Sequence, residues 1–250
     1  MERMTAEKGG DSRQHTPPPT MSKQDKNRSD QTQAENGQSL RTLSHSLSWA
    51  LRHAAPELGL DISPDGYVPV SDLLACSHPR FRGWTENDVR AVVETNDKQR
   101  YKLCYRRVGD SEILLIRANQ GHSIPNIDPH QLLTPVPPEE LRLLTIIHGT
   151  SLDAWNNHIQ REGLSRMTRN HMHFATGLPK DKGVISGMRK SCQVYIFVDG
   201  EQCATHGIEF FRSDNGVLLT AGVHNEGVLP LAFISHVTDA SGQLLWSNDS

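Results

Sequence analysis

Residues 124–140 read IPNIDPHQLLTPVPPEE and carry five prolines, at positions 125, 129, 135, 137 and 138. Proline fixes φ and has no backbone N–H to donate, so helices and central strands rarely continue through such a stretch. The composition therefore predicts a linker over 124–140 that joins two domains, residues 40–123 and residues 141–238. A short C-terminal tail is predicted over 239–250.

On the N-terminal side of this segment, helices come first and a hairpin follows. Apolar residues at helical spacing predict a first amphipathic helix that begins near Leu40: Leu43, Leu47, Ala50, Leu51 and Ala54. Two further helices are predicted, one capped by Ser71 and one by Thr85. Alternating strands over 101–106 and 113–116 follow. Helices followed by a hairpin predict a winged-helix-like lobe.

On the C-terminal side, strand patterns dominate. An apolar strand is predicted over 143–147 and a helix from 152 to 159 that ends at Gly163. Residues 194–198 predict a further strand, and residues 210–219 predict a hairpin that turns at Asp214-Asn215-Gly216. This half therefore predicts a small domain on a mainly antiparallel sheet, and the whole chain is expected to be α+β.

The composition excludes several classes of protein. Residues 1–39 are polar, include three consecutive prolines and predict a disordered tail. The net charge of −3 argues against nucleic-acid binding by bulk charge, although a local basic site stays possible.

The four cysteines form no CxxC pair, and no apolar run is long enough to cross a membrane or direct secretion, so an intracellular protein is expected. Walker, GxGxxG, HExxH and GxSxG motifs are absent from the sequence.

Two cations end the first predicted helix. Arg52 and His53 can simply complement the negative end of the helix dipole. Alternatively, the guanidinium fork and a protonated imidazole can bind a dianionic phosphate, with Arg100 as another arm if its strand folds back beside the helix. For Arg100 the other interpretation is a solvated strand cation.

A second group of candidates lies in the C-terminal half. His148-Gly149-Thr150 follows an apolar strand and can let a ligand approach the backbone at Gly149, although a buried structural histidine explains His148 equally well. His171 and His173 share one face of a predicted strand and with His148 can form a zinc site, but no second motif supports a metal and none is expected. Arg189 is either solvated or directed toward a ligand above the sheet edge.

Seven motifs occur together in one order, between about Leu40 and Phe233. They are Leu51-Arg52-His53, the segment 96–101 (NDKQRY), Gln120-Gly121-His122-Ser123, His148-Gly149-Thr150, His173-Phe174-Ala175, Ser186-Gly187-Met188-Arg189 and the segment 215–220 (NGVLLT). In this respect the chain resembles the tRNA 2′-phosphotransferase family, NAD⁺-dependent RNA repair and splicing enzymes related to ADP-ribosyltransferases. The resemblance implies a winged-helix-like RNA lobe and an ADP-ribosyltransferase-like NAD⁺ lobe.

The resemblance also implies a reaction. The internal 2′-phosphate left at a splice junction of ligated tRNA attacks the ribose carbon of NAD⁺ that bears nicotinamide, giving an ADP-ribosylated RNA phosphate. The 2″-hydroxyl of that ribose then attacks phosphorus, which releases a 2′-hydroxyl RNA and ADP-ribose 1″,2″-cyclic phosphate. NAD⁺ is thus expected as a consumed co-substrate and RNA as the partner, with no protein or membrane partner.

The family's site residues are carried over by motif. Arg52, His53, Arg100 and Arg189 are expected to be catalytic, with Arg189 assigned to the second step. The resemblance places His148, Gly149, Thr150 and His173 at the NAD⁺ ribose and nicotinamide, and puts Val217 where many protein-modifying relatives carry glutamate. A few RNA backbone contacts are expected from Lys98, Lys102, Arg106 or Arg107.

Two alternatives of other kinds stay open at this point. One is an ADP-ribosyltransferase that caps terminal phosphates of nucleic acids and stops after the first step. The other is a catalytically inert winged-helix nucleic-acid binder. Composition excludes neither, although an inert binder would have no use for all four cationic positions.

Overall fold

The computed structural model describes residues 39–179, 181, 188 and 191–248. Almost all of the predicted tail over 1–39 and the candidate Arg189 lie outside the described residues. Every strand pairing in the described part is antiparallel. The prediction of an α+β protein on antiparallel sheets is therefore confirmed. Within the described residues no helix has the length and apolar character needed to cross a membrane.

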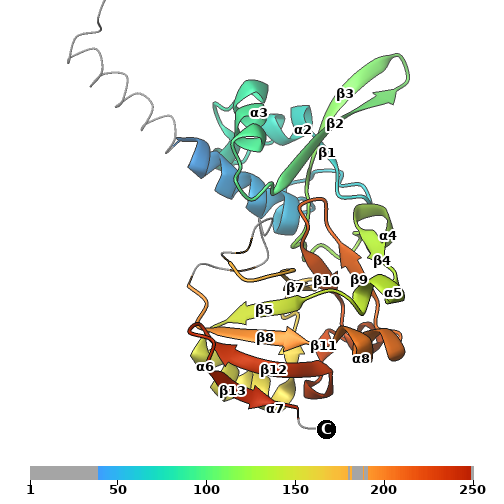
Figure 1. Ribbon diagram of the computed structural model, residues 1–250. Helices are drawn as coiled ribbons and strands as arrows, with labels where there is room; N and C mark the ends of the chain where they lie inside the picture. The colour runs from blue at the N-terminus through green and yellow to red at the C-terminus, as the bar shows by residue number, and fades with distance from the viewer. Residues whose placement is uncertain (1–38, 180, 182–187, 189–190, 249–250) are drawn as a thin grey trace, which may run out of the picture. The chain divides into compact units, whose positions relative to one another are not determined.

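The N-terminal half combines helices with a three-stranded sheet of order β1-β3-β2 (Figure 1). Residues 39–49 form an α-helix that continues into a π-helical turn. The further elements of this half are η1 (Ala50–Ala54), β1 (Val68–Pro69), α2 (Val70–Ala75), η2 (Pro79–Phe81), α3 (Glu86–Glu94), β2 (Tyr101–Val108) and β3 (Ser111–Ala118). The predicted helices and hairpin are present, and the more specific winged-helix assignment stays a prediction.

Local signals explain the ends of two of these elements. Thr85 and Asp88 form a reciprocal capping box at the start of α3, as predicted. The β2–β3 turn uses Gly109 at φ +61°, a left-handed conformation that glycine adopts without strain. The predicted cap at Ser71 is wrong: α2 already begins at Val70, and no side chain caps it. The hydroxyl of Ser71 instead bonds to the carboxylate of Asp72.

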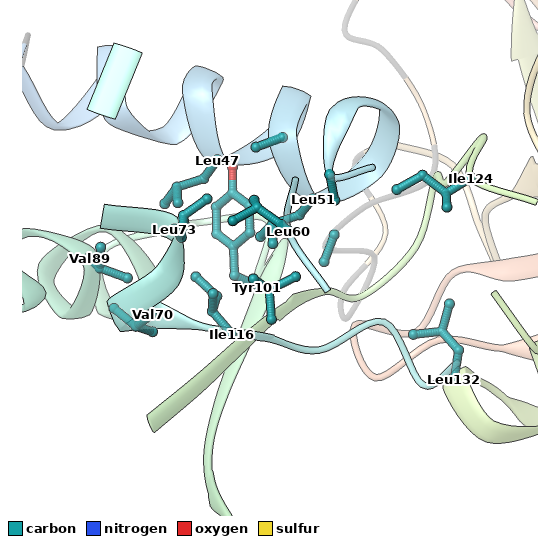
Figure 2. Packing of buried hydrophobic residues seen from close by; sticks show 14 of the residues in the cluster. Leu47, Leu51, Leu60, Val70, Leu73, Val89, Tyr101, Ile116, Ile124 and Leu132 are labelled. Carbon is teal, nitrogen blue, oxygen red and sulfur yellow. The ribbon is translucent and has the colours of Figure 1, made fainter. Parts of the chain in front are cut away.

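The first hydrophobic core lies between the N-terminal helix and the three-stranded sheet. Figure 2 shows Leu47, Leu60 and Leu73 beside the ring of Tyr101, which is 5% exposed. The Tyr101 hydroxyl lies 2.6 Å from Ser48 Oγ, which satisfies the one polar atom of this side chain. The stripe of apolar residues predicted for the first helix is therefore the side that faces the core.

The C-terminal half contains three further sheets, of order β4-β9-β10-β7, β13-β12-β8-β5 and β11-β6. Its strands are β4 (Thr134–Val136), β5 (Ile146–Thr150), β6 (Leu164–Ser165), β7 (Met172–Phe174), β8 (Val194–Val198), β9 (Phe210–Arg212), β10 (Leu218–Thr220), β11 (Val228–Leu229), β12 (Ile234–Asp239) and β13 (Leu244–Ser247). Its helices are α4 (Pro129–Leu132), α5 (Pro138–Leu141), α6 (Leu152–Ala154), η3 (Trp155–Ile159), α7 (Gln160–Glu162), α8 (Gly200–Thr205), η4 (Val223–Asn225) and η5 (Leu231–Phe233).

The proline-rich segment 124–140 is not a simple linker. It contains α4 and α5, and between them β4, which pairs with β9 through Thr134–Arg212, Pro135–Phe211 and Val136–Phe210. β4 is an edge strand, where a proline without an N–H can be accommodated. The prolines at the starts of α4 and α5 also fit, because the first helical turn has no partner for its N–H groups. Residues 239–250 likewise contribute β13 to a sheet.

The sheet that contains β9 and β10 lies between two cores. Phe210 and Leu218 belong to the core of the C-terminal half, whereas their neighbours Phe211 and Leu219 belong to the first core. This division follows from strand geometry, since successive side chains point to opposite faces. The predicted β9–β10 hairpin therefore joins the two halves of the protein. The ADP-ribosyltransferase-like assignment of the C-terminal half stays a prediction.

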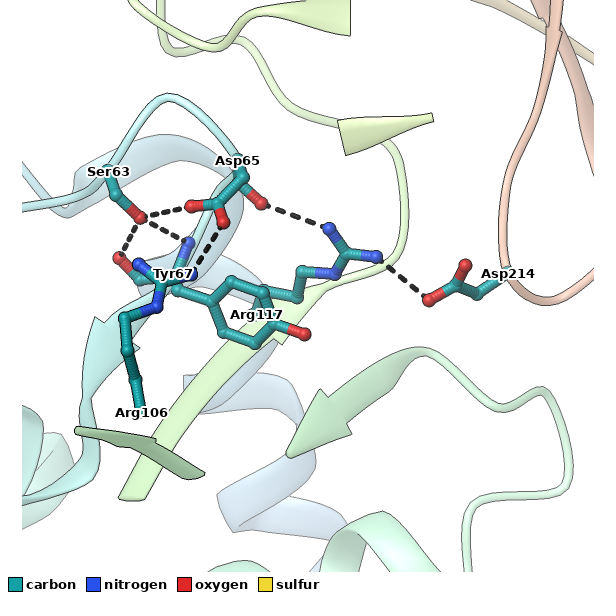
Figure 3. Close-up of polar contacts among 6 residues, drawn as sticks. All are labelled: Ser63, Asp65, Tyr67, Arg106, Arg117 and Asp214. Atoms are coloured by element: carbon teal, nitrogen blue, oxygen red, sulfur yellow. Dashed lines mark hydrogen bonds and ion pairs between the residues drawn. The ribbon is translucent and has the colours of Figure 1, made fainter. Parts of the chain in front are cut away.

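The turn of this hairpin also carries a polar contact to the N-terminal half. Asp214 accepts from Arg117 on β3 at 2.8 Å and pairs with Lys102 on β2 at 2.8 Å. Figure 3 shows Arg117 between Asp214 and Asp65, whose backbone carbonyl accepts from the other guanidinium nitrogen at 3.2 Å. This contact connects the β9–β10 turn to strands β2 and β3 of the N-terminal sheet.

Candidate active site

A cavity of about 590 Å³ lies where the two halves meet. Its lining includes members of both groups of residues that the sequence singles out. From the N-terminal half come Arg52, Lys98, Arg100 and Gln120; from the C-terminal half come His148, Gly149, Thr150, Ser151, Ala154, Ser165, Arg166, Met167, Thr168, Arg169, His171, Met172, His173, Met188, Ser191 and Cys192. A volume of this size is typical of sites for small molecules and cofactors.

Arg52 and His53 lie in the π-helical turn η1 at the end of the first helix. The segment 120–123 holds this turn: the Ser123 backbone N–H donates to the Arg52 carbonyl at 2.9 Å, and Ser123 Oγ lies 2.8 Å from His53 Nδ1. Gly121, at φ +92°, packs against the Arg52 side chain. The motif at 120–123 thus positions the Arg52–His53 pair. Arg52 lines the cavity, whereas His53 is exposed beside it.

Arg100 reaches the cavity from the start of the β2–β3 hairpin. Asn96 Oδ1 accepts from the Arg100 backbone N–H at 3.1 Å and from its Nη1 at 3.3 Å. Lys98, two residues earlier, also lines the cavity. Its backbone carbonyl accepts from Asn215 Nδ2 at 2.8 Å, so the β9–β10 turn helps to place this loop.

The electrostatics of the cavity favour an anion. The cationic side chains that line it are Arg52, Lys98, Arg100, Arg166 and Arg169. None of the described lining residues is acidic. Burial lowers the pKa of Arg52 to about 10, and the positive charges of Arg100 and Arg169 add to this shift. Guanidiniums that are crowded together and partly desolvated gain when a phosphate or carboxylate binds between them.

The surroundings of His53 disfavour its protonated form. Burial, followed by the positive charge of Arg52, lowers its pKa from 6.5. The neutral imidazole is therefore favoured before an anion binds, and the predicted contact of His53 with a phosphate stays a prediction. A neutral ring can still exchange a proton with Ser123 or with a bound ligand.

The His148-Gly149-Thr150 segment lies on β5, slightly later than the predicted strand at 143–147. His148 Nδ1 donates to the backbone carbonyl of His173 at 2.9 Å, which fixes the ring. A Cβ at Gly149 would lie 2.7 Å from Cys192 Sγ and 2.8 Å from Met188 Sδ. Only glycine fits here without displacing these side chains, and the predicted approach of a ligand at this position stays a prediction.

His173 provides a hydrogen-bonding group that the described residues do not satisfy. Its side chain is buried on β7, and Nε2 has no partner in the described part of the protein. Burial holds the pKa of His173 well below 6.5, and the nearby Arg169 and Arg52 lower it further. A buried polar atom without a partner is costly, so this nitrogen is suited to a ligand in the cavity.

The three-histidine zinc site gains no support. His148, His171 and His173 all line the cavity, but in the described part no group of three or more His, Cys, Asp or Glu residues is arranged to hold a metal ion. His171 packs its ring against Phe211, and burial lowers its pKa to about 4.

Two cations of the cavity were missed from the sequence. Arg166 and Arg169 lie in the loop between β6 and β7, where Arg166 Nη1 donates to the Arg169 carbonyl at 2.8 Å. The only local signal is a pair of cations between two strands, which usually indicates a solvated loop. Of the predicted RNA contacts, Lys102 and Arg106 instead form ion pairs with Asp214 and Asp65.

The cation-lined cavity between the two halves of this antiparallel α+β protein is suited to an anionic ligand. Residues 38–222 match the model of the family described as RNA 2′-phosphotransferase, Tpt1 / KptA family, and the chain belongs to this family. It is 47% identical over 196 residues to tRNA 2′-phosphotransferase 1 of Homo sapiens, covering 76% of this chain and 73% of the human protein. It is 37% identical over 183 residues to tRNA 2′-phosphotransferase of Saccharomyces cerevisiae, covering 72% of this chain and 78% of the yeast protein. The sequence-based recognition is confirmed.

Proposed function

We propose that this protein removes the 2′-phosphate that ligation leaves at a tRNA splice junction and transfers it to NAD⁺. The products are RNA with a 2′-hydroxyl, nicotinamide and ADP-ribose 1″,2″-cyclic phosphate. The observation that carries the proposal is the single cavity that gathers Arg52 and Arg100 with His148, Gly149, Thr150 and His173. Family membership and the names of the relatives support the RNA substrate.

The residues of the N-terminal half are assigned to the RNA phosphate. Arg52 and Arg100 donate parallel hydrogen bonds to its oxygens, which orients the dianion as a nucleophile without protonating it. His53, held near Ser123, is placed at the rim to exchange a proton when the RNA 2′-oxygen leaves in the second step. Arg189 is proposed to stabilise negative charge on phosphorus oxygens in that step, by motif alone, because it lies outside the described residues.

The residues of the C-terminal half fit the co-substrate. Gly149 lines the cavity, and His173 Nε2 is available for a hydrogen bond to a ribose hydroxyl or an amide. NAD⁺ supplies the electrophilic ribose carbon and nicotinamide as the leaving group. Arg166 and Arg169 add positive charge on the side of the cavity where its phosphates would be accommodated.

Val217 bears on the choice of nucleophile. It is fully buried in the first core, so no carboxylate at this position can activate a hydroxyl or amine acceptor. A phosphate brings its own negative charge and needs no such base. The burial of Val217 therefore supports a phosphate acceptor over a protein side chain.

The test is to incubate the purified protein with a short RNA that carries one internal 2′-phosphate, with and without NAD⁺, and to resolve the products by mass spectrometry. We expect NAD⁺-dependent loss of phosphate together with the cyclic phosphate. An RNA that carries only a terminal phosphate serves as a matched control. Modification of the control alone would favour the capping enzyme, and no reaction with either RNA despite measured binding would favour the inert binder.

A further inference from the structure

A cluster of rings and guanidiniums lies on the N-terminal half, outside the cavity. We call the surface formed by Trp49, His78, Arg80 and Arg82 the tryptophan–arginine patch. The ring centroids of Trp49 and His78 lie 4.9 Å apart, and Cζ of Arg80 lies 4.8 Å from the centroid of Trp49. None of its members lines the cavity. The cluster is therefore a second surface, distinct from the proposed active site.

The positive charge of the patch is not compensated within the described part of the protein. Arg80 and Arg82 are exposed, and the described residues offer neither side chain a hydrogen bond or an ion pair. By contrast, Arg90, Arg106 and Arg117 all pair with carboxylates. Residues 73–85, which carry most of the patch, contain no Asp or Glu. Two guanidiniums thus stay available for an anionic partner.

The backbone beneath the patch is well held. The Arg80 N–H donates to His78 Nδ1 at 3.2 Å, and Trp84 Nε1 donates to the Arg80 carbonyl at 3.1 Å. Phe81, between the two arginines, is 1% exposed and anchors η2 in the first core. Little backbone entropy is lost when a ligand binds to such a surface.

The patch lies next to the phosphate site along one helix. Trp49 comes four residues before His53, about one helical turn, on the helix that continues without a break from residue 39 to Ala54. An RNA chain whose phosphate is held at Arg52 would follow this helix for about one turn to reach the Trp49 ring, against which Arg80 packs.

Two half-buried rings beside two exposed guanidiniums match the chemistry of single-stranded nucleic acid. Bases stack on tryptophan, histidine and arginine planes, and arginine donates to phosphate oxygens. We propose that the tryptophan–arginine patch binds the single-stranded RNA that flanks the 2′-phosphorylated nucleotide. This inference rests on the proposed function, because the RNA reaches the patch from the active site. The patch would then select RNA that extends beyond the reacting phosphate.

The test compares two substrates in the full chain. One is a trinucleotide with a central 2′-phosphate, and the other is a ten-nucleotide single strand with the same phosphate near its middle. For R80A/R82A we expect kcat/KM on the longer RNA to fall roughly tenfold, chiefly through KM, with the trinucleotide unaffected. The salt dependence of binding to the longer RNA should weaken by about 1.4 in logarithmic slope, because two phosphate contacts are lost. Arg161→Ala removes an exposed arginine elsewhere and should leave both substrates unaffected.

Binding of the longer RNA without NAD⁺, measured by fluorescence anisotropy, separates this inference from the proposed function. Weaker binding of the longer RNA by R80A/R82A supports the patch as an RNA site. This holds even if the wild-type protein turns over neither RNA, because absence of turnover would contradict only the proposed function. Equal losses on both RNAs, or wild-type affinity of the double variant, would overturn the patch as an RNA site. Wild-type RNA affinity of the double variant would leave a protein partner as the occupant of the patch.

Discussion

Arg117 and Asp214 form an ion pair of 2.8 Å between the N-terminal sheet and the β9–β10 turn. The Arg117 side chain is only 8% exposed, whereas Asp214 is 34% exposed and also pairs with Lys102. The next residue, Asn215, donates to the Lys98 carbonyl in the loop that lines the cavity. One turn of the C-terminal half thus holds both a buried cation and a segment of the site.

Asp214→Asn should therefore destabilise the protein. The substitution removes the negative charge that faces a nearly buried guanidinium, and the free energy of unfolding should fall by about 1–3 kcal/mol. Urea unfolding at pH 7 measures this change. Lys102→Ala removes the more exposed partner and should cost about 0–1 kcal/mol. Equal losses for the two variants would show that burial of Arg117 does not determine the effect.

Asn96→Ala should impair the reaction more than it impairs folding. Asn96 orients Arg100 through two hydrogen bonds, so its loss lets the guanidinium move away from the phosphate. We expect kcat to fall roughly 10- to 100-fold. Thr95→Ala is the matched control, because the neighbouring hydroxyl bonds only within its own helix, to the Ala91 carbonyl. A similar loss of kcat in both variants would indicate damage to the helix end instead.

Arg52→Ala should reduce single-turnover removal of the 2′-phosphate by roughly 10²–10³-fold, because one preorganised donor to the phosphate is lost. Arg52→Lys keeps the charge but cannot donate two parallel hydrogen bonds, and we expect it to recover only a small part of the rate. Arg142→Ala, which removes a surface arginine paired with Glu201, serves as the control. Full activity of Arg52→Lys would show that charge alone suffices.

His173→Ala should raise KM for NAD⁺ roughly tenfold, the loss expected for one hydrogen bond from a buried donor or acceptor. His173→Gln, which retains polar atoms at a similar reach, should recover part of the affinity. RNA affinity in the absence of NAD⁺ is the internal control and should stay unchanged. Loss of RNA affinity in His173→Ala would place this histidine on the RNA side of the cavity.

Buried histidines should make the protein less stable in mild acid. The pKa of His171 is lowered from 6.5 to about 4 and that of His122 to about 3, in both cases chiefly by burial. Unfolded histidines bind protons below pH 6.5, whereas the folded ones do not until these lower values are reached. The stabilisation is therefore complete above pH 6.5 and declines as the pH falls toward 4, by up to about 1.4 kcal/mol per pH unit for each group.

Urea unfolding at pH 7.5, 6.0 and 5.0 measures this decline. His171→Gln cannot take up a proton, so the decline should be shallower by up to about 1.4 kcal/mol per pH unit. A decline of the same steepness in the variant would show that His171 titrates normally in the folded protein.

Sequence alone determined the elements whose signals lie within a few residues of one another. The Thr85–Asp88 capping box, the glycine turn of β2–β3 and the β9–β10 turn at Asp214-Asn215-Gly216 depend on local hydrogen bonds and backbone freedom. Asp199-Gly200 shows where local signals become ambiguous: such a pair is typical of a turn after a strand, yet here Asp199 follows strand β8 and caps helix α8.

Only the tertiary structure decided which distant residues meet. The prolines of 124–140 predict a linker, yet β4 finds its partner in β9, more than seventy residues later. Lys102 and Arg106 are predicted from the sequence to contact the RNA backbone, yet in the fold they pair with Asp214 and Asp65. Arg166 and Arg169 join the cavity only because their loop folds over it. Local patterns record backbone preferences, whereas a site between two halves depends on packing between segments that the sequence keeps far apart.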